Sequence, residues 1–141
     1  MMRILKLLFL HMMMLVPISA SADVAGDQEK FDWNPVMDAI IQVESKGNPR
    51  AVSGCYVGVL QISPVLVREC NNILKRQGIK KTYSLSDRYN EQKSREMFVI
   101  IQSFHNPSNN VEKAIRMWNG GPGYSVARTQ RYLNKVYKNM K

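Results

Sequence analysis

Apolar residues recur at helical spacing from residue 36 onward, and the first such run has clear start and stop signals. Asn34-Pro35 suits a helix start, with Asn as the N-cap and Pro at the first helical position. Gly47-Asn48-Pro49 ends the run, because Gly and Pro both interrupt helices. Glu44 is therefore predicted in the last turn of a helix, beside a sharp break in the chain. The apolar positions of this helix are Val36, Ala39, Ile40 and Val43.

Four further helices are predicted. They begin at Pro64 (ending at Gly78), at Asn90-Glu91 (running to about His105), at Asn109 or Asn110 (ending near Trp118), and at Ser125. The expected apolar positions are Val65, Leu66, Ile73 and Leu74 in the second helix, and Ala127, Leu133, Val136 and Tyr137 in the last. Residues 50–62 are short, β-branched and interrupted by Gly, which predicts a small hairpin or an extended loop. Residues 80–88 form a polar connection. The fold class is mainly α, with about five helices, one small extended insertion and one core.

Residues 1–22 have the pattern of a secretory signal peptide rather than of a folded element. A basic start is followed by the apolar stretch Leu7–Val16, and Ala20-Ser21-Ala22 forms an A-x-A cleavage site. The apolar stretch is shorter than the roughly 20 residues of a membrane-spanning helix. We therefore expect cleavage after Ala22, a periplasmic or extracellular location, and no stable membrane insertion afterwards. Residues 23–32 are expected to be a flexible segment and residues 33–141 the folded domain.

The length of 141 residues fits one domain, and the chain is basic, with 20 Lys+Arg and 11 Asp+Glu. The predicted cleavage removes Arg3 and Lys6, so the formal net charge falls from +9 to +7. Positive charge on an exported protein suits nucleic acid, an anionic membrane surface or an acidic cell-wall polymer. The sequence contains no nucleic-acid-binding motif, so we expect no nucleic-acid partner.

The sequence contains few features of a metal-binding or nucleotide-binding site. The predicted mature chain has a single His, His105, and contains neither HExxH nor CxxC, so we expect no metal and no cofactor. Gly120-Gly121-Pro122-Gly123 lacks the Lys and the Ser or Thr of a phosphate-binding loop. Cys55 and Cys70 could form a disulfide or remain free thiols. A disulfide would stabilise the fold by roughly 3 kcal/mol, because it lowers the entropy of the unfolded chain. No local signature supports either Cys as a nucleophile with His105.

Glu44 is the strongest candidate for chemistry. Ile40 and Ile41 precede it by one helical turn, so its carboxyl would share part of the apolar, core-facing stripe. Partial desolvation favours the neutral carboxylic acid, which general-acid cleavage of a glycosidic bond requires. From its position alone, an ordinary surface glutamate near a helix end is the more common interpretation.

Four short motifs occur in a characteristic order: Glu44-Ser45, Gly58-Val59-Leu60-Gln61, Met117-Trp118-Asn119, and Tyr132 near the C-terminus. In this order and spacing the chain resembles the soluble lytic transglycosylase family and its goose-type lysozyme relatives. The resemblance covers roughly residues 33–137. It implies a lysozyme-like α+β fold and a site that binds glycan strands of peptidoglycan.

The resemblance also implies a role for each matching residue. Glu44 matches the sole catalytic acid/base, Ser45 a residue that orients that acid or the sugar, and Tyr132 the tyrosine that stands near the acid. Gly58 and Gln61 match the motif that lines the cleft in this family, where Gly allows a sugar to approach and Gln hydrogen-bonds it.

Asn119 matches the residue that holds the N-acetyl group or the sugar ring. The family's Ala-Tyr pair is Met117-Trp118 here, so the aromatic face for a sugar is kept while the phenol is lost. Cys55-Tyr56-Val57 stands where the family commonly has small residues, directly before the motif that begins at Gly58.

The implied reaction cleaves the bond between N-acetylmuramic acid and N-acetylglucosamine and leaves a 1,6-anhydro ring, without consuming water. A lysozyme-type hydrolase on the same fold is the first alternative, and a non-catalytic wall-binding or assembly module is the second. An inverting hydrolase needs a second carboxylate, and no acid occurs from Ser45 to Gln61. A second carboxylate would have to come from Glu69, Asp87, Glu91 or Glu96. Beyond peptidoglycan, a secretion or conjugation apparatus is a candidate partner.

Overall fold

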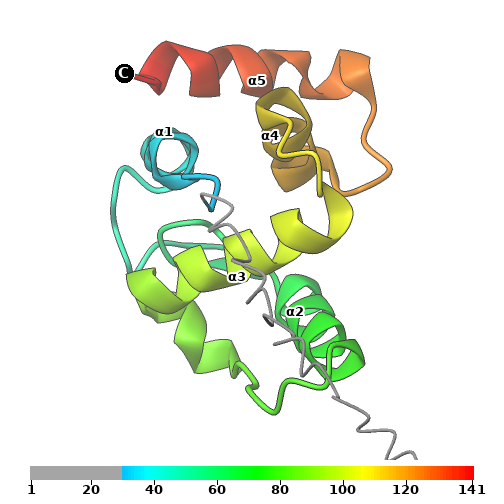
Figure 1. Cartoon of the computed structure of the whole chain (residues 1–141). Coiled ribbons are helices and arrows are strands. Elements are labelled where there is room, and N and C mark those ends of the chain that lie inside the picture. The colour runs from blue at the N-terminus through cyan, green and yellow to red at the C-terminus, as the bar shows by residue number, and fades with distance from the viewer. Residues whose placement is uncertain (1–29) are drawn as a thin grey trace, which may run out of the picture. The chain divides into compact units, whose positions relative to one another are not determined.

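The computed structural model describes residues 30–141; the predicted signal peptide lies outside the described residues. The described part is mainly helical, with a small two-stranded antiparallel sheet (Figure 1). Its elements are α1 (Asn34–Glu44), β1 (Val52–Ser53), β2 (Tyr56–Val57), α2 (Pro64–Arg76), the 3₁₀ helix η1 (Leu85–Tyr89), α3 (Glu91–His105), α4 (Val111–Gly120) and α5 (Val126–Asn139). The predicted fold class, five helices and a hairpin in a lysozyme-like α+β arrangement, is confirmed. None of the described helices is long and apolar enough to cross a bilayer.

Side-chain caps fix most of the helix starts at the predicted positions. Ser63 accepts a hydrogen bond from the backbone of Leu66 at the start of α2, and Asn90 accepts one from Lys93 at the start of α3. Asn110, rather than Asn109, caps α4, and Ser125 caps α5.

The start of α1 differs by one residue from the expectation. Trp33 occupies the N-cap position and Asn34 is already helical, so Pro35 stays within the first turn. The side chain of Asp32 takes over the capping role, because its Oδ1 accepts a hydrogen bond of 2.9 Å from the Asn34 backbone N–H.

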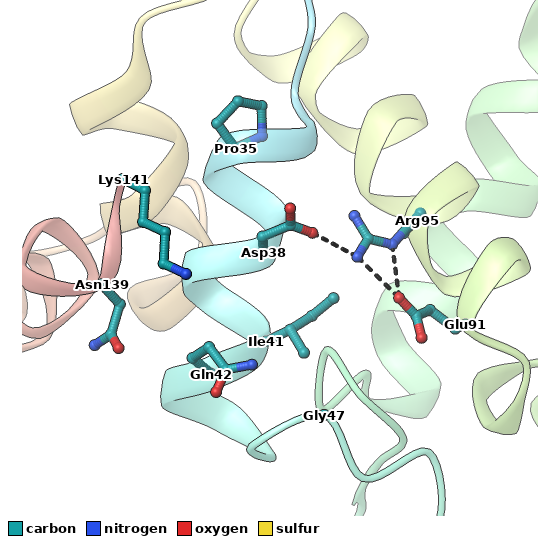
Figure 2. A pocket seen from close by; sticks show the side chains of 9 residues that line it. All are labelled: Pro35, Asp38, Ile41, Gln42, Gly47, Glu91, Arg95, Asn139 and Lys141. Atoms are coloured by element: carbon teal, nitrogen blue, oxygen red, sulfur yellow. Dashed lines mark hydrogen bonds and ion pairs between the residues drawn. The ribbon is translucent and has the colours of Figure 1, made fainter.

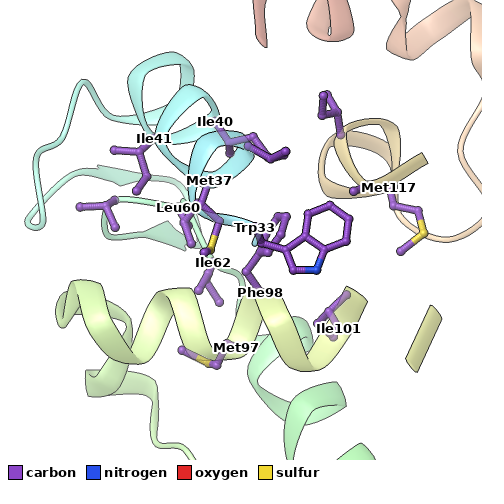
Figure 3. Packing of buried hydrophobic residues seen from close by; sticks show 14 of the residues in the cluster. Trp33, Met37, Ile40, Ile41, Leu60, Ile62, Met97, Phe98, Ile101 and Met117 are labelled. Carbon is purple, nitrogen blue, oxygen red and sulfur yellow. The ribbon is translucent and has the colours of Figure 1, made fainter. Parts of the chain in front are cut away.

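The core lies where α1, the segment after the hairpin, α3 and α4 meet. Trp33 packs edge-on against Phe98, with ring centroids 5.7 Å apart, and Phe98 in turn packs against Trp118 at 4.8 Å. Met37, Ile40, Leu60, Ile62, Met97 and Ile101 are gathered around these rings (Figure 3). Helix α5 lies across α1 and α4 (Figure 1), and it closes this side of the core with Leu133 and Val136.

Two predicted apolar faces were partly wrong. In α2, Val65 is 62% exposed, and Val67 and Cys70 are buried instead. In α5, Ala127 and Tyr137 are exposed.

Thr129 occupies the inner face of α5 in their place. Its hydroxyl donates to the Ser125 carbonyl (2.7 Å) and accepts from the Arg116 guanidinium (3.0 Å), so it is buried with its hydrogen bonds satisfied.

Cys55 and Cys70 are both free thiols, so the disulfide alternative is not realised in the structure. Cys70 points into the core, where its Sγ lies 3.5 Å from the Met97 carbonyl oxygen. Cys55 is exposed at the hairpin turn. The two side chains therefore occupy different environments.

Candidate active site

Glu44 meets Tyr132 at the junction of α1 and α5. The Tyr132 hydroxyl lies 2.7 Å from Glu44 Oε1 and donates a hydrogen bond to it. Glu44 is the last residue of α1; the helix ends there because Lys46 and Gly47 both have positive φ. The side chain is half-buried, as the apolar residues one turn earlier predicted. Glu44 and Tyr132, both predicted site residues, are thus brought into direct contact.

The surroundings of Glu44 favour its neutral form. Burial raises the pKa of the Glu44 carboxyl above its usual value, and the hydrogen bond from Tyr132 offsets part of this effect. The pKa of Tyr132 is also raised, by its burial and by the adjacent carboxyl, so its hydroxyl keeps its proton and remains a donor. A carboxyl with a raised pKa beside a fixed donor can give up a proton and then be stabilised as a carboxylate.

Ser45 ties the end of α1 to the segment after the hairpin. Its Oγ lies 2.8 Å from the Val59 carbonyl oxygen and 3.2 Å from that of Ile41, and it accepts a hydrogen bond from the Gly47 backbone. All these partners are backbone groups. The geometry therefore fits the role of orienting the acid better than that of binding a sugar.

Trp118 makes the matching contact from α4. Its indole N–H donates to the Leu60 carbonyl at 3.0 Å, and its ring packs on Phe98. The consecutive carbonyls of Val59 and Leu60 are thus held from two sides, by Ser45 and by Trp118. The indole N–H is engaged within the protein, so it is not a free donor for a ligand.

Gly58 is required by a close approach within the protein. Its φ is +83°, and a Cβ at this position would lie 1.9 Å from the carbonyl oxygen of Arg88. The backbone of η1 is therefore the neighbour that requires glycine here. This contact is within the protein, and it gives no information on whether Gly58 also makes room for a sugar.

Gln61 turns its amide nitrogen inward. Its Nε2 donates to the carbonyls of Gly58 (2.9 Å) and Ala51 (3.1 Å), while its own backbone has a positive φ of 51°. The amide oxygen has no hydrogen-bond partner among the described residues. Asn119 is exposed near the end of α4 and likewise makes no side-chain hydrogen bond within residues 30–141.

Arg88 is a site-supporting residue that sequence reasoning missed. It is buried, and its guanidinium donates to the carbonyls of Leu85 (2.8 Å), Cys55 (3.0 Å) and Ile62 (3.1 Å). It thereby fixes both ends of the segment that contains Gly58 and Gln61. No local signal identifies it, since an Arg in a polar connection is normally solvated.

The four acids considered as a second carboxylate are each engaged elsewhere. Their partners are His105 for Glu69 (3.0 Å), Lys93 for Asp87 (2.9 Å), Arg95 for Glu91 (2.8 Å) and Lys81 for Glu96 (2.7 Å). None of them contacts Glu44 or Tyr132 through a hydrogen bond. Among the described residues, no group of three or more His, Cys, Asp or Glu side chains could hold a metal ion.

A groove of about 790 Å³ runs along the other side of α1 (Figure 2). Within it, Arg95 lies between Asp38 (2.6 Å) and Glu91 (2.8 Å), so its positive charge is compensated. Gln42 and Lys141 line the groove as well, whereas Glu44 does not. The groove is therefore separate from the Glu44–Tyr132 pair.

The fold and the pairing of a half-buried glutamate with a tyrosine define a lysozyme-like α+β domain with a candidate site at Glu44 and Tyr132. Residues 21–140 match the model of the family described as the transglycosylase SLT domain, and the chain belongs to this family. Membership indicates lytic transglycosylase activity that cleaves peptidoglycan, as the four ordered motifs predicted. Searches of curated proteins and of solved structures found no match.

Proposed function

We propose that the chain is an exported peptidoglycan lytic transglycosylase in which Glu44 alone acts first as acid and then as base. The proposal is based mainly on the hydrogen bond that Tyr132 donates to the Glu44 carboxyl, whose pKa is raised by burial. Glu69 is hydrogen-bonded to His105, and Asp87, Glu91 and Glu96 form ion pairs with Lys93, Arg95 and Lys81, which supports a mechanism without a second carboxylate.

In the first step, neutral Glu44 donates its proton to the oxygen that joins N-acetylmuramic acid to N-acetylglucosamine. The bond between that oxygen and C1 of the muramic acid breaks, and the N-acetylglucosamine end leaves as an alcohol. The acetamido group of the substrate stabilises the positive charge that develops at C1. The Tyr132 hydroxyl stabilises the carboxylate that Glu44 becomes.

In the second step, the Glu44 carboxylate removes the proton from the C6 hydroxyl of the muramic acid. The C6 oxygen bonds to C1 and forms the 1,6-anhydro ring, while Glu44 regains its proton. No water is consumed. The amide oxygen of Gln61, the Asn119 amide and the ring face of Trp118 are the groups we assign to holding the strand.

The test is the digestion of purified peptidoglycan by the wild-type chain and by Glu44→Gln, with mass spectrometry of the released ends. Glu69→Gln is the matched control, because it makes the same chemical change in a half-buried carboxyl that binds His105. We expect anhydro-muramic ends from wild type and Glu69→Gln, and none from Glu44→Gln.

Reducing ends would instead indicate a hydrolase and contradict the single-acid mechanism. Binding of the strands without any cleavage by wild type would favour a non-catalytic wall-binding module. Export is tested separately, by sequencing the N-terminus of the protein recovered outside the cytoplasm; the predicted mature chain starts at Asp23.

A further inference from the structure

Helix α5 carries a row of exposed basic side chains beside Tyr132. The row consists of Arg128, Arg131, Lys135 and Lys138, and we call it the α5 basic row. Helix α5 contains no Asp or Glu, and none of the four forms an ion pair with a described residue. The row is therefore a strip of positive charge that the described part of the protein does not neutralise.

Two members of the row, Arg128 and Lys135, lie one helical turn from Tyr132 and are its neighbours on the surface of α5. At about 100° per residue, its members lie roughly 40–120° to one side of Tyr132 around the helix axis. Thr129, Leu133 and Val136 lie roughly 40–100° to the other side and are buried in the core. Because Tyr132 points at Glu44, one flank of this tyrosine is closed by the core and the other opens onto the basic row.

A shallow groove of about 540 Å³ follows the row along α5. Arg131, Lys135 and Lys138 line it, together with the amides of Gln130 and Asn134. Guanidinium, ammonium and amide groups are donors that suit carboxylates. The groove thus has the charge and the hydrogen-bonding character of a site for an anionic, extended ligand.

We propose that the α5 basic row binds the free carboxylates of the peptide stems of peptidoglycan, and that the enzyme thereby prefers strands whose stem carboxylates are unmodified. This inference rests on the proposed function, since it concerns the same substrate. A strand that reaches Glu44 passes the flank of Tyr132, and its stems are the negatively charged groups nearest to the glycan.

An anionic membrane fits the row less well. A helix that lies in a bilayer interface buries its apolar face in the lipid. The apolar face of α5 is occupied by the protein core, and its exposed apolar side chains, Val126 and Tyr137, lie roughly opposite the row. The basic and apolar surfaces of α5 therefore cannot contact one membrane together.

The experiment compares two double variants with the same change in charge. Arg131→Gln with Lys138→Gln removes two charges from the row and keeps Arg128 and Lys135, the two members of the row that lie one helical turn from Tyr132. Arg68→Gln with Lys75→Gln is the matched control, because it removes one Arg and one Lys, also seven residues apart, from exposed positions of α2. Thermal unfolding of both variants checks that each is folded.

Binding is measured in the Glu44→Gln background, so that the strands stay intact. The polymers are purified peptidoglycan and the same material with its carboxylates converted to amides. We expect the row variant to bind unmodified peptidoglycan about threefold to tenfold more weakly than the control variant, and the difference to disappear at high salt. On the amidated polymer the two variants should bind alike.

With Glu44 present, the row variant should raise KM by a similar factor and leave kcat unchanged. Equal binding by the two variants, or equally tight binding of the amidated polymer by the parent, would overturn the inference. So would a loss confined to DNA or to vesicles of phosphatidylglycerol and phosphatidylcholine. A binding difference between the two variants, without any cleavage by wild type, would support carboxylate binding by the α5 basic row and contradict the proposed activity. The experiment therefore distinguishes a failure of this inference from a failure of the proposed function.

Discussion

The Tyr132 hydroxyl lies 2.7 Å from the Glu44 carboxylate, although the two residues are 88 positions apart in the chain. Tyr132 donates to the carboxyl and lowers its pKa against the larger effect of burial. The contact therefore sets how far the pKa of Glu44 is raised, and the acid and base steps both depend on that value.

Tyr132→Phe should raise the pKa of Glu44 further and reduce turnover by about tenfold or more, because a charge-assisted hydrogen bond is lost. The acid step needs neutral Glu44, so the alkaline limb of the pH profile of kcat/KM should move to higher pH. Tyr137→Phe is the control, since this tyrosine lies on the same helix and is exposed. An alkaline limb that stays in place would show that Tyr132 does not tune Glu44.

Glu44→Gln should make the protein more stable at neutral pH, by about 1 kcal/mol, while it abolishes cleavage. The pKa of Glu44 is raised in the folded state, so the folded state holds this proton more tightly than the unfolded state does. The stability that this proton contributes is present below pH 4.5, the unfolded value, and is lost as pH rises through the folded pKa.

Urea unfolding of wild type and Glu44→Gln at pH 4 and pH 7 provides the measurement. The advantage of the variant should be larger at pH 7 than at pH 4. An advantage that is the same at both pH values would contradict a raised folded pKa.

Local signals predicted most of the fold, whereas the contacts that shape the site come from distant parts of the chain. Ser63, Asn90, Asn110 and Ser125 each cap a helix from an adjacent position, so their roles can be inferred within a few residues. By contrast, the short helix η1 has no apolar period and was expected only as a polar connection.

The site residues were located by the order of their motifs, but the directions of their side chains could not be predicted. Ser45 bonds a carbonyl 14 residues away, and Trp118 bonds one 58 residues away. Only the packing of α1, α4 and the hairpin segment brings these partners together. Arg88 was missed for the same reason, since its guanidinium bonds the carbonyls of Cys55 and Ile62, which lie 33 and 26 residues away in the chain.

Trp118→Phe should destabilise the protein by about 1–3 kcal/mol. The ring that packs on Phe98 is largely kept, while the carbonyl of Leu60, a residue that is fully buried, loses its donor. Urea unfolding of Trp118→Phe, Ser45→Ala and the double variant measures whether the two anchors act together. Because they hold consecutive carbonyls, the effects should be non-additive; strict additivity would show that each anchor acts on its own.

Gly58→Ala should destabilise the fold by about 3 kcal/mol or more, since it combines a strained positive φ with a backbone clash 1.9 Å from the Arg88 carbonyl oxygen. Gly47→Ala is the matched control: its φ is +80°, close to the +83° of Gly58, but an added Cβ would meet nothing within 4 Å. The control should cost only the backbone strain, about 1–2 kcal/mol. The difference in unfolding free energy between the two variants isolates the contact between η1 and the hairpin segment. Equal losses would mean that η1 can move away from residue 58, and that this contact does not hold the Gln61 segment in place.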